Sequence, residues 1–383
     1  MGPLAGIKII EMAHIGPVPH CAMLLADLGA TVLRIERAEP SDLGLARPVA
    51  SEVLLRGRKA IALDLKRPAS VDLTLRLMEC ADALIEGFRP GTMERLGLGP
   101  DIALGRNAKL VYGRMTGWGQ SGPLSLRAGH DLNYLALSGA LHAIGRAQQP
   151  PTPPLNWLGD YGGGSMFLAV GLLSAIMEAR SSGLGQVVDV AMIDGVASLL
   201  ANYQGARQAG LMQLPRGENL LDSGAFFYDV YKCEDDKYLS VACIEEKFFR
   251  QFLACLGLDP QSFPSQEHRA QWEGARSILV ERFLTRSQAE WMRVFEGTDS
   301  CVAPVIEISD VSTHPHHQAR SSYVKIAGVV QPIPAPRFSR TKPELPSPPV
   351  NASPATFSDA LATWLPPDQI DILQKTLRES SVQ

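Results

Sequence analysis

The loop after the first predicted strand lacks the glycine-rich motif of dinucleotide-binding enzymes, and the chain lacks the motifs of P-loop enzymes and α/β-hydrolases. The loop after the first predicted strand, residues 13–20, holds one glycine and two prolines, so it has no G-x-G-x-x-G pattern for a dinucleotide pyrophosphate. The chain also has no G-x-x-x-x-G-K-[ST] loop and no G-x-S-x-G nucleophile elbow. These absences leave NAD or FAD binding, P-loop chemistry and α/β-hydrolase chemistry without support.

Cysteine pairs, excess positive charge and long apolar runs are also missing. The six cysteines are scattered without a C-x-x-C pair, which is typical of reduced core thiols. The net charge of -4 argues against a nucleic-acid partner, which needs a concentrated basic surface. We find no apolar run of bilayer-spanning length and no secretory signal, and therefore expect a cytoplasmic protein without membrane insertion. The trio His314, His316 and His317 has no further ligand at metal-binding spacing, so we expect a solvated loop and no metal.

Strand and helix patterns alternate along the first part of the chain. Strands are predicted at 7–11, 31–35, 60–65, 83–86, 110–114 and 187–190, and helices at 17–28, 71–80 and 165–179. Such repeats predict an α/β fold with a parallel sheet covered by helices on both faces.

Changes in composition divide the chain into four ranges. Residues 1–190 form the predicted large domain, 191–224 a linker helix and loop, and 225–312 a smaller α/β domain. Residues 313–383 are predicted to return to the large domain and to end in helices. Because prolines are dense in residues 330–350, we expect that stretch to be extended.

Two motifs could carry proton-transfer chemistry. The first, residues 129–134 (GHDLNY), places His130 before a predicted helix, where the helix dipole favours the neutral imidazole of a base. The second places Asp160 before three glycines that allow a ligand close to the backbone. Taken alone, each motif also fits a purely structural role, with Asp131 or Asp160 capping a helix.

Two further groups of charged residues could support a ligand or a catalytic side chain. A basic group lies at strand ends and in loops of the first domain, and could bind several phosphates or be scattered surface charge: Arg34, Arg37, Arg56, Arg58, Lys59, Lys66, Arg89 and Arg95. Glu245 and Glu246 follow a predicted strand of the second domain. They could orient His130 if domains or subunits meet there, or be solubilising charge.

Motifs spread over nearly the whole chain resemble one family, the class III CoA-transferases, and within it the α-methylacyl-CoA racemase branch. They are PLAGI (3–7), DLGA (27–30), IEGFRPG (85–91), RLGLG (95–99), MTGWGQSGP (115–123), GQVVD (185–189) and PAPRFS (334–339). Each is weak by itself, but together and in this order they are specific. The resemblance implies a Rossmann-like large domain, a small α/β domain and an interlocked homodimer whose sites lie between domains of different chains.

The resemblance also implies the chemistry. Transferases of the family use an aspartate at the position of Asp160 as a covalent nucleophile and generally lack the histidine of the G-H-D-x-N-Y motif. This chain has the complete motif, with Gly129, Asp131, Asn133 and Tyr134 around His130. We therefore expect inversion of the α-carbon of a 2-methylacyl-CoA by proton transfer through an enolate, with a CoA-transferase as the alternative. A non-catalytic acyl-CoA-binding protein is a further alternative.

Site residues follow from the same resemblance. His130 and Asp160 are the expected proton-transfer groups, and Glu245 supports His130, although Glu246 stands where the family has proline. The expected coenzyme A region comprises Arg37, Arg58, the backbone of Leu63, Arg89 and Arg95, and the motif residues Gly129, Asp131, Asn133 and Tyr134 are expected to help bind the substrate. Coenzyme A is part of the substrate, and no separate cofactor is expected.

Overall fold

The computed structural model describes residues 1–39, 44, 45 and 47–379, and it divides into two compact units. The first unit comprises residues 1–138, 155–199 and 315–383, and the second comprises 139–154 and 200–314. These units differ from the predicted ranges because residues 139–154 pack with the second unit. The last four residues of the predicted return segment, 380–383, lie outside the described part.

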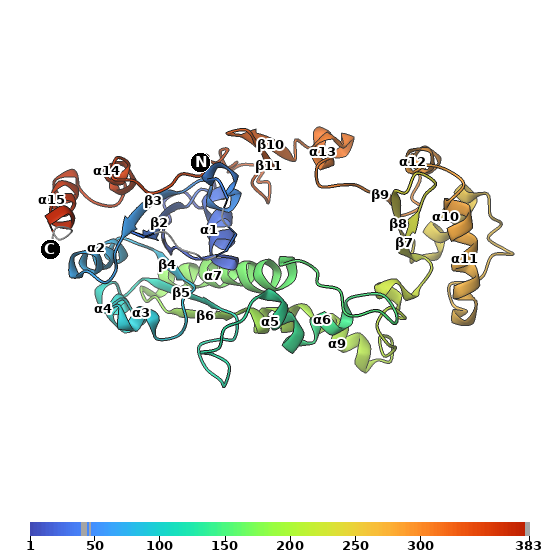
Figure 1. Ribbon diagram of the computed structural model, residues 1–383, viewed down its shortest axis with the longest axis horizontal. Coiled ribbons are helices and arrows are strands. Elements are labelled where there is room, and N and C mark those ends of the chain that lie inside the picture. Colours follow the sequence, from blue (N-terminus) through green and yellow to red (C-terminus); the bar gives the residue numbers. More distant parts are fainter. Residues whose placement is uncertain (40–43, 46, 380–383) are drawn as a thin grey trace. The chain divides into compact units, whose positions relative to one another are not determined.

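A six-stranded parallel sheet forms the centre of the first unit (Figure 1). Its strand order is β3-β2-β1-β4-β5-β6, and every neighbouring pair is parallel. The strands are β1 (Lys8–Met12), β2 (Thr31–Arg37), β3 (Lys59–Leu63), β4 (Ala83–Glu86), β5 (Val111–Thr116) and β6 (Val187–Ala191). The order reverses between β1 and β4, as in doubly wound folds, so the predicted α/β class is confirmed.

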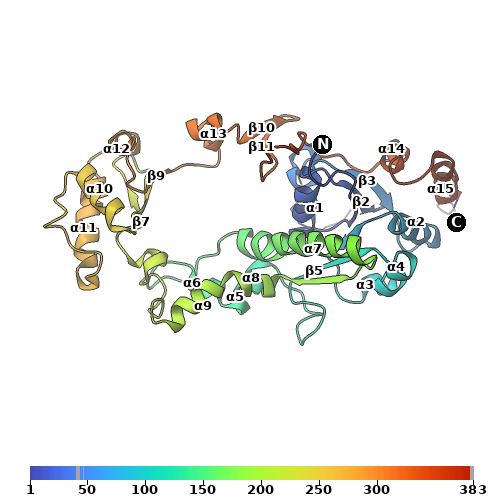
Figure 2. The same cartoon turned by 180° about the vertical axis from the view of Figure 1, so that it is seen from behind.

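Alternating side chains bury both faces of this sheet. Ile9 and Val32 point to the face covered by α1 (Pro17–Asp27) and α7 (Phe167–Ser182). Their neighbours Ile10 and Leu33 point to the opposite face, which is covered by α2 (Pro68–Glu79), α4 (Pro100–Arg106), α14 (Phe357–Leu361) and α15 (Pro367–Glu379). Figure 2 shows α7 running along its side of the sheet. Each fully buried isoleucine or leucine contributes about 1.5–3 kcal/mol of transfer free energy.

Three helices of the first unit, α1 (Pro17–Asp27), α2 (Pro68–Glu79) and α7 (Phe167–Ser182), lie close to their predicted positions. The unit also contains α3 (Thr92–Arg95), α4 (Pro100–Arg106), α5 (Asp131–Ser138), α8 (Met192–Leu199), α13 (Pro315–Ala319), α14 (Phe357–Leu361) and α15 (Pro367–Glu379). Of these, α13 includes His316 and His317, which were expected in a loop. Helix α1 ends before Gly29, as predicted. The φ angle of Gly29 is +100°, and a Cβ there would lie 3.0 Å from Gly2, so only glycine fits.

The prediction for the glycine-rich segment after Asp160 was wrong. It placed a turn at Gly162–Gly164 and a helix start at Ser165, but residues Trp157–Met166 form a π-helical segment that continues directly into α7. Asp160 therefore lies inside a helix, in its first turn. Glycines lower helix propensity, and packing against neighbouring helices overrides that local preference here.

The merged helix Trp157–Ser182 also corrects the expectation about apolar runs. It has 26 residues and a hydropathy of 1.4 in its best window, which meets the length and composition of a membrane-spanning helix. Of that window, 44% is buried inside the protein. Its residues Leu168, Leu172 and Ile176 belong to the core of the first unit, which accounts for the apolar composition.

The second unit is a smaller α/β structure, as predicted. Its antiparallel sheet has the order β7-β8-β9. Its elements are α6 (Ala140–Ala143), α9 (Ala201–Gln208), β7 (Tyr228–Lys232), β8 (Tyr238–Ala242), α10 (Glu246–Leu256), α11 (Trp272–Phe283), α12 (Gln288–Phe295) and β9 (Val302–Val305). Its core is rich in aromatic side chains, including Phe226, Phe252 and Trp291. Buried Asp229 pairs with Arg146 and Arg276, which joins residues 139–154 to this unit.

The C-terminal segment from Pro315 belongs to the first unit. It contains an antiparallel hairpin of β10 (Tyr323–Ile326) and β11 (Val329–Pro332). Arg56, which is buried, donates to the side chain of Gln331 at 2.9 Å and pairs with Asp27 of α1 at 2.5 Å. These contacts attach the returning hairpin to α1.

Candidate active site

A cavity of about 580 Å³ opens at the carboxyl ends of strands β1, β2 and β3. Its lining includes Met12 and Ala13 after β1, Arg37 at the end of β2, Leu63 at the end of β3, and Phe88 after β4. Open parallel sheets bind ligands at this edge, next to the point where the strand order reverses. The cavity therefore lies where the fold predicts a ligand site.

The predicted coenzyme A residues are distributed unevenly around this cavity. Arg37 and Leu63 line it directly. Arg95 is exposed and donates to Thr92, which does line the cavity, at 3.0 Å. Arg89 is exposed in the loop that carries Phe88.

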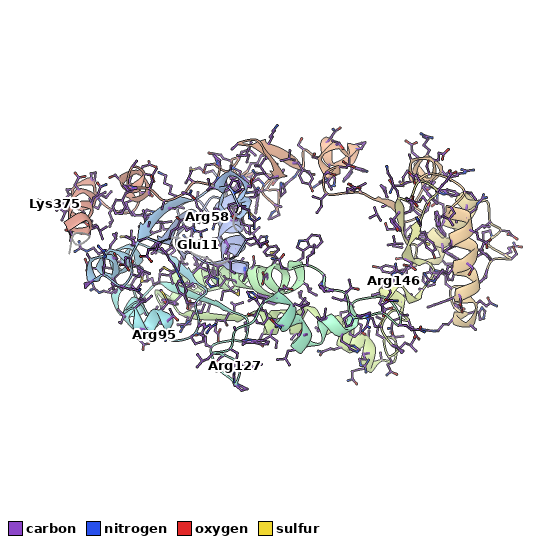
Figure 3. The ribbon with its side chains drawn as sticks, in the orientation of Figure 1. Glu11, Arg58, Arg95, Arg127, Arg146 and Lys375 are labelled. Atoms are coloured by element: carbon purple, nitrogen blue, oxygen red, sulfur yellow. The ribbon has the colours of Figure 1, made fainter. Side chains whose placement is uncertain are left out.

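Arg58 has a different environment. It is 4% exposed and forms an ion pair with Glu11, which is fully buried in β1. Figure 3 shows the two side chains close together inside the first unit. Arg58 is not among the residues that line the cavity, and its guanidinium is already paired with the Glu11 carboxylate.

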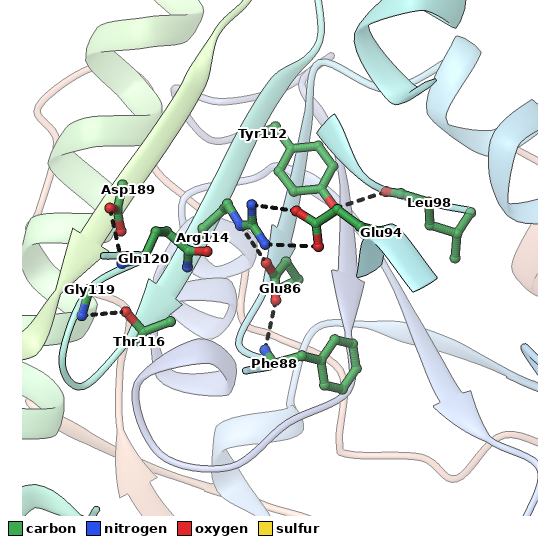
Figure 4. Close-up of polar contacts among 10 residues, drawn as sticks. All are labelled: Glu86, Phe88, Glu94, Leu98, Tyr112, Arg114, Thr116, Gly119, Gln120 and Asp189. Carbon is green, nitrogen blue, oxygen red and sulfur yellow. Dashed lines mark hydrogen bonds and ion pairs between the residues drawn. The ribbon is translucent and has the colours of Figure 1, made fainter. Parts of the chain in front are cut away.

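A buried ionic network supports the loop beside the cavity (Figure 4). Arg114 of β5 donates to Glu86 at 3.0 Å and to Glu94 at 2.8 Å. Glu86 in turn accepts the backbone N–H of Phe88 at 2.7 Å. Burial raises the pKa of Glu86 to about 7, although Arg114 and the Phe88 N–H both favour its charged form. The network thus connects the sheet to the cavity residue Phe88.

The G-H-D-x-N-Y motif holds His130 at the start of α5. Asn133 accepts the backbone N–H of His130 at 3.0 Å, and the Tyr134 hydroxyl donates to the carbonyl of Gly129 at 2.5 Å. The ring of Tyr134 packs edge-on against Trp118, at 4.7 Å between centroids. A Cβ on Gly129 would lie 2.8 Å from Tyr134, which explains the glycine. The His130 side chain itself is exposed.

Asp131 joins this motif to the segment that carries Asp160. Its Oδ1 accepts the backbone N–H of Asp160 at 2.7 Å. The backbone of Gly159 also bonds to Asp131, and a Cβ on Gly159 would lie 2.4 Å from the same oxygen. The structure therefore brings the two predicted motifs together through the residue next to His130.

The carboxylate of Asp160 lies in a partly buried environment. Oδ2 accepts a hydrogen bond from Asn156 at 3.1 Å, and a Cβ on Gly16 would lie 2.9 Å from that oxygen. Burial raises the pKa of Asp160, the Asn156 hydrogen bond lowers it, the charge of Asp131 raises it, and His130 lowers it. An acid with a raised pKa is suited to exchange a proton near neutral pH.

Sequence reasoning missed Asn156 and Gly16. Asn156 precedes Asp160 by four residues, a spacing that places two side chains together on a helix. The signal was overlooked because the helix was predicted to begin after Asp160. Gly16, with φ at +66°, appeared only as the single glycine of the first loop. Its contact with Asp160 depends on helix packing.

Glu245 lies in the second unit, where it precedes α10. Its neighbour Glu246 forms an ion pair with Arg250 at 2.5 Å on the exposed face of that helix. The two glutamates thus have different local environments, with Glu246 already paired. In residues 1–39, 44, 45 and 47–379, no group of three or more histidine, cysteine or acidic side chains is arranged to hold a metal ion.

Comparison with solved structures shows the fold. The chain superimposes on a CaiB/BaiF family protein from Brucella suis with a TM-score of 0.78 and 24% identity, covering 92% of this chain and 96% of that one. A hypothetical protein from Mycobacterium tuberculosis gives a TM-score of 0.78 at 24% identity, covering 95% and 99%.

Comparison of sequences shows the family. The chain is 42% identical to α-methylacyl-CoA racemase from Mus musculus and 39% identical to that from Homo sapiens, covering 90% of this chain and 88% of each relative. It is 30% identical to a succinyl-CoA–L-malate CoA-transferase alpha subunit from Chloroflexus aurantiacus, over 88% of this chain and 83% of that one. The family model for CoA-transferase family III matches residues 4–357. The chain therefore belongs to CoA-transferase family III.

Proposed function

We propose that the protein inverts the α-carbon of 2-methylacyl-CoA thioesters by proton transfer between His130 and Asp160. The observation that carries the proposal is the hydrogen bond from the Asp160 backbone to Asp131, the residue that follows His130. This bond joins the segment that carries Asp160 to the start of the helix that follows His130. Covalent catalysis alone would need Asp160 but not the adjacent histidine.

Inversion requires one group on each face of the α-carbon. One group removes the α-proton to give an enolate, and the other returns a proton to the opposite face. General acid–base catalysis of this kind contributes on the order of 10²–10⁴-fold. The raised pKa of Asp160 increases the fraction of its protonated form available as the acid near neutral pH.

The developing enolate oxygen needs hydrogen-bond donors for the remaining acceleration. The candidates are backbone N–H groups near Asp131 or Gly162. Gly162 lies within the π-helical segment, where a backbone N–H has a helical partner, so it is a poor candidate. At the start of α5 the Asn133 N–H already bonds the His130 carbonyl at 2.8 Å, so the N–H groups of Asp131 and Leu132 are the candidates, and one such donor contributes roughly 10²–10³-fold.

The cavity at the strand ends is the proposed binding place of the coenzyme A moiety. Arg37 supplies a guanidinium that suits phosphate oxygens, and Leu63 supplies backbone groups at the end of β3. Ala13 lines this cavity, and three residues later Gly16 contacts the Asp160 carboxylate. A ligand that follows this short loop would place its thioester next to Asp160. We assign Arg58 a supporting role, because it pairs with Glu11.

The relatives favour a racemase over a transferase. The relatives named racemases are about 40% identical to this chain, whereas transferases are about 30% identical. The alternative remains a CoA-transferase that uses Asp160 as nucleophile, since relatives with that name also cover most of the chain.

Residues Glu245 and His130 lie in different units, and their pairing across a homodimer is part of the proposal. Exposed Met166, Val170 and Met177 on one helix are consistent with a partner surface, and light scattering after gel filtration tests for the dimer.

A direct test is to incubate one epimer of a 2-methylacyl-CoA with the protein in D₂O and to follow the α-proton by NMR. Loss of the α-proton signal together with formation of the other epimer, in the absence of any acceptor acid, supports the proposal. A saturable binder that exchanges no α-proton would instead be an acyl-CoA-binding protein. A transferase would require an acceptor acid and would form an Asp160 anhydride that hydroxylamine traps.

A further inference from the structure

A histidine–serine pair, with His20 partly buried and Ser165 fully buried, lies close to Asp160 but has no part in the proposed proton transfer. His20 of α1 and Ser165 of the π-helical segment are hydrogen-bonded, with 2.5 Å between Nδ1 and Oγ. The His20 ring also stacks on Tyr161, with 4.3 Å between ring centroids and 23° between planes. Tyr161 directly follows Asp160, so both contacts act on the segment that carries the proposed acid.

That segment needs support from outside. Residues Trp157–Met166 form a π-helix, a geometry that is rare and mostly confined to single turns within α-helices. Its sequence, WLGDYGGGSM, includes four glycines, which favour the unfolded backbone over a helix. The position of the Asp160 carboxylate therefore depends on neighbouring elements that hold the segment in place.

The N-terminal part of α1, together with Gly16 just before it, contacts this segment at three successive points. Gly16 lies against the Asp160 carboxylate, and a Cβ on Gly164 would lie 3.0 Å from Pro17. One turn further along α1, His20 bonds Ser165 and stacks on Tyr161. Of these contacts, only the His20–Ser165 contact is a directional hydrogen bond between side chains.

A histidine beside a serine also resembles a base beside a nucleophile, but the environment excludes that role. Ser165 is fully buried, so a substrate carbonyl cannot reach its hydroxyl. Burial, with a smaller effect of the Arg56 charge, lowers the pKa of His20 to about 4. The imidazole therefore stays neutral at physiological pH and can bond Ser165 without carrying a charge.

We infer that His20 and Ser165 are a positioning pair that holds Asp160 in register for proton transfer. The inference rests on the proposed function, since it assumes that Asp160 exchanges protons with substrate. A displacement of about 1 Å in a reacting group can reduce a rate by about 10²-fold. A loosened π-helical segment would produce such a displacement while leaving the coenzyme A cavity, formed by other elements, unchanged.

The test compares His20→Phe, which keeps an aromatic ring against Tyr161, with Ser165→Ala, which removes the other partner. Both should lower kcat for α-proton exchange by about 10- to 100-fold and change KM by less than about twofold. The double variant should be no worse than either single variant, because both remove the same bond. His20→Gln, which retains a hydrogen-bonding group, should recover part of the kcat.

A matched control removes a buried hydrogen bond elsewhere in the first unit. Thr74 is fully buried and donates to the Ser70 carbonyl at 2.8 Å on α2. Thr74→Val should lower stability without changing kcat or its pH dependence. If the kcat losses in the His20 and Ser165 variants simply follow the fraction of protein unfolded, as measured by urea denaturation, the pair is only structural and the inference is wrong.

A second measurement does not depend on turnover. The ¹³C resonance of the Asp160 carboxyl, assigned by its absence in Asp160→Asn, reports its pKa. The titratable groups that face Asp160, namely Asp131, His130 and Tyr134, are unchanged in the His20 and Ser165 variants. Greater solvation should therefore shift the midpoint towards that of an ordinary aspartate.

The two measurements separate the inference from the proposed function. If the wild-type protein exchanges no α-proton, the proposed function is wrong, and a shifted Asp160 midpoint in the variants would still support positioning. If the wild-type protein is active but both variants keep its kcat and its Asp160 midpoint, the positioning role alone is overturned.

Discussion

Oδ1 of Asp131 accepts the backbone N–H of Asp160 at 2.7 Å, across 29 residues of sequence. This bond joins the start of α5, where His130 lies, to the π-helical segment that holds Asp160. Asp131 is 8% exposed, so the bond is largely protected from water. The predictions below follow from this connection and from the contacts around it.

Removal of the Asp131 carboxylate should affect both stability and chemistry. Asp131→Ala leaves the N–H groups of Gly159 and Asp160 without their partner, and one unsatisfied buried group costs about 1–3 kcal/mol. We expect that loss of unfolding free energy in urea, with a larger fall in kcat than change in KM. Asp131→Asn keeps an acceptor oxygen and should retain most of the stability. Equal destabilisation in both variants would contradict the role of this hydrogen bond.

Loss of one proton-transfer group should still allow the α-proton to exchange with deuterium but should prevent inversion of the α-carbon. In His130→Ala, Asp160 can still remove and return the α-proton on its own face. Only one epimer should then incorporate deuterium, and it should keep its configuration. Asp160→Asn should show the same behaviour with the opposite epimer. NMR combined with chiral separation measures both quantities, and inversion at the wild-type rate in either variant would exclude the two-base mechanism.

The pH dependence should respond to Asn156. Its hydrogen bond favours the charged form of Asp160 and so lowers the pKa of that carboxyl. Asn156→Ala removes the bond, so the pKa of Asp160 should rise. For the epimer whose proton Asp160 removes, the acid limb of kcat/KM should therefore move to higher pH. Asn107→Ala, which removes hydrogen bonds to the Met78 and Ala81 carbonyls, is the control and should leave the limb in place.

Gly16 and Gly6 form a matched pair for testing the contact with Asp160. Both have positive φ, +66° and +88°, so alanine strains the backbone at each site by about 1–3 kcal/mol. A Cβ at Gly16 would also lie 2.9 Å from Asp160, whereas a Cβ at Gly6 has nothing within 4 Å. Gly16→Ala should lower kcat by about 10²-fold, and Gly6→Ala should reduce only the melting temperature. Similar activity in the two variants would show that the contact is unimportant.

The cavity can be tested through the affinity for acyl-CoA. Arg37→Ala removes a lining guanidinium, and loss of one phosphate contact of about 1.4 kcal/mol should raise KM about tenfold with little change in kcat. Arg76→Ala removes an exposed arginine of α2 that pairs with Asp72 and should leave KM unchanged. An unchanged KM in Arg37→Ala would place the phosphates elsewhere.

Local sequence patterns were sufficient to locate most elements of the fold. The strand predicted at 83–86 matches β4, and the helix predicted at 17–28 matches α1 to within one residue, because period-2 and period-3.6 apolar patterns reflect which faces are buried. The G-H-D-x-N-Y motif was identified by its resemblance to the family. Its internal contacts join residues three to five positions apart, so a local stretch of sequence contains all of them. The π-helical segment was missed, since its glycines oppose helix formation and only packing against α1 and α8 holds them there.

The sequence by itself determined the family and the α/β class, and it predicted His130 and Asp160 as the two acid–base residues. Only the tertiary structure decided how the segments that carry these residues are hydrogen-bonded to each other, and which arginine side chains remain available to a ligand. Arg58 appeared equivalent to Arg37, yet Arg58 is buried against Glu11 while Arg37 faces the cavity. The bonds from Asp160 to Asp131, and from His20 to Ser165, join residues 29 and 145 positions apart. Such contacts arise from how the helices pack on the sheet, and the local sequence pattern around each residue does not specify that packing.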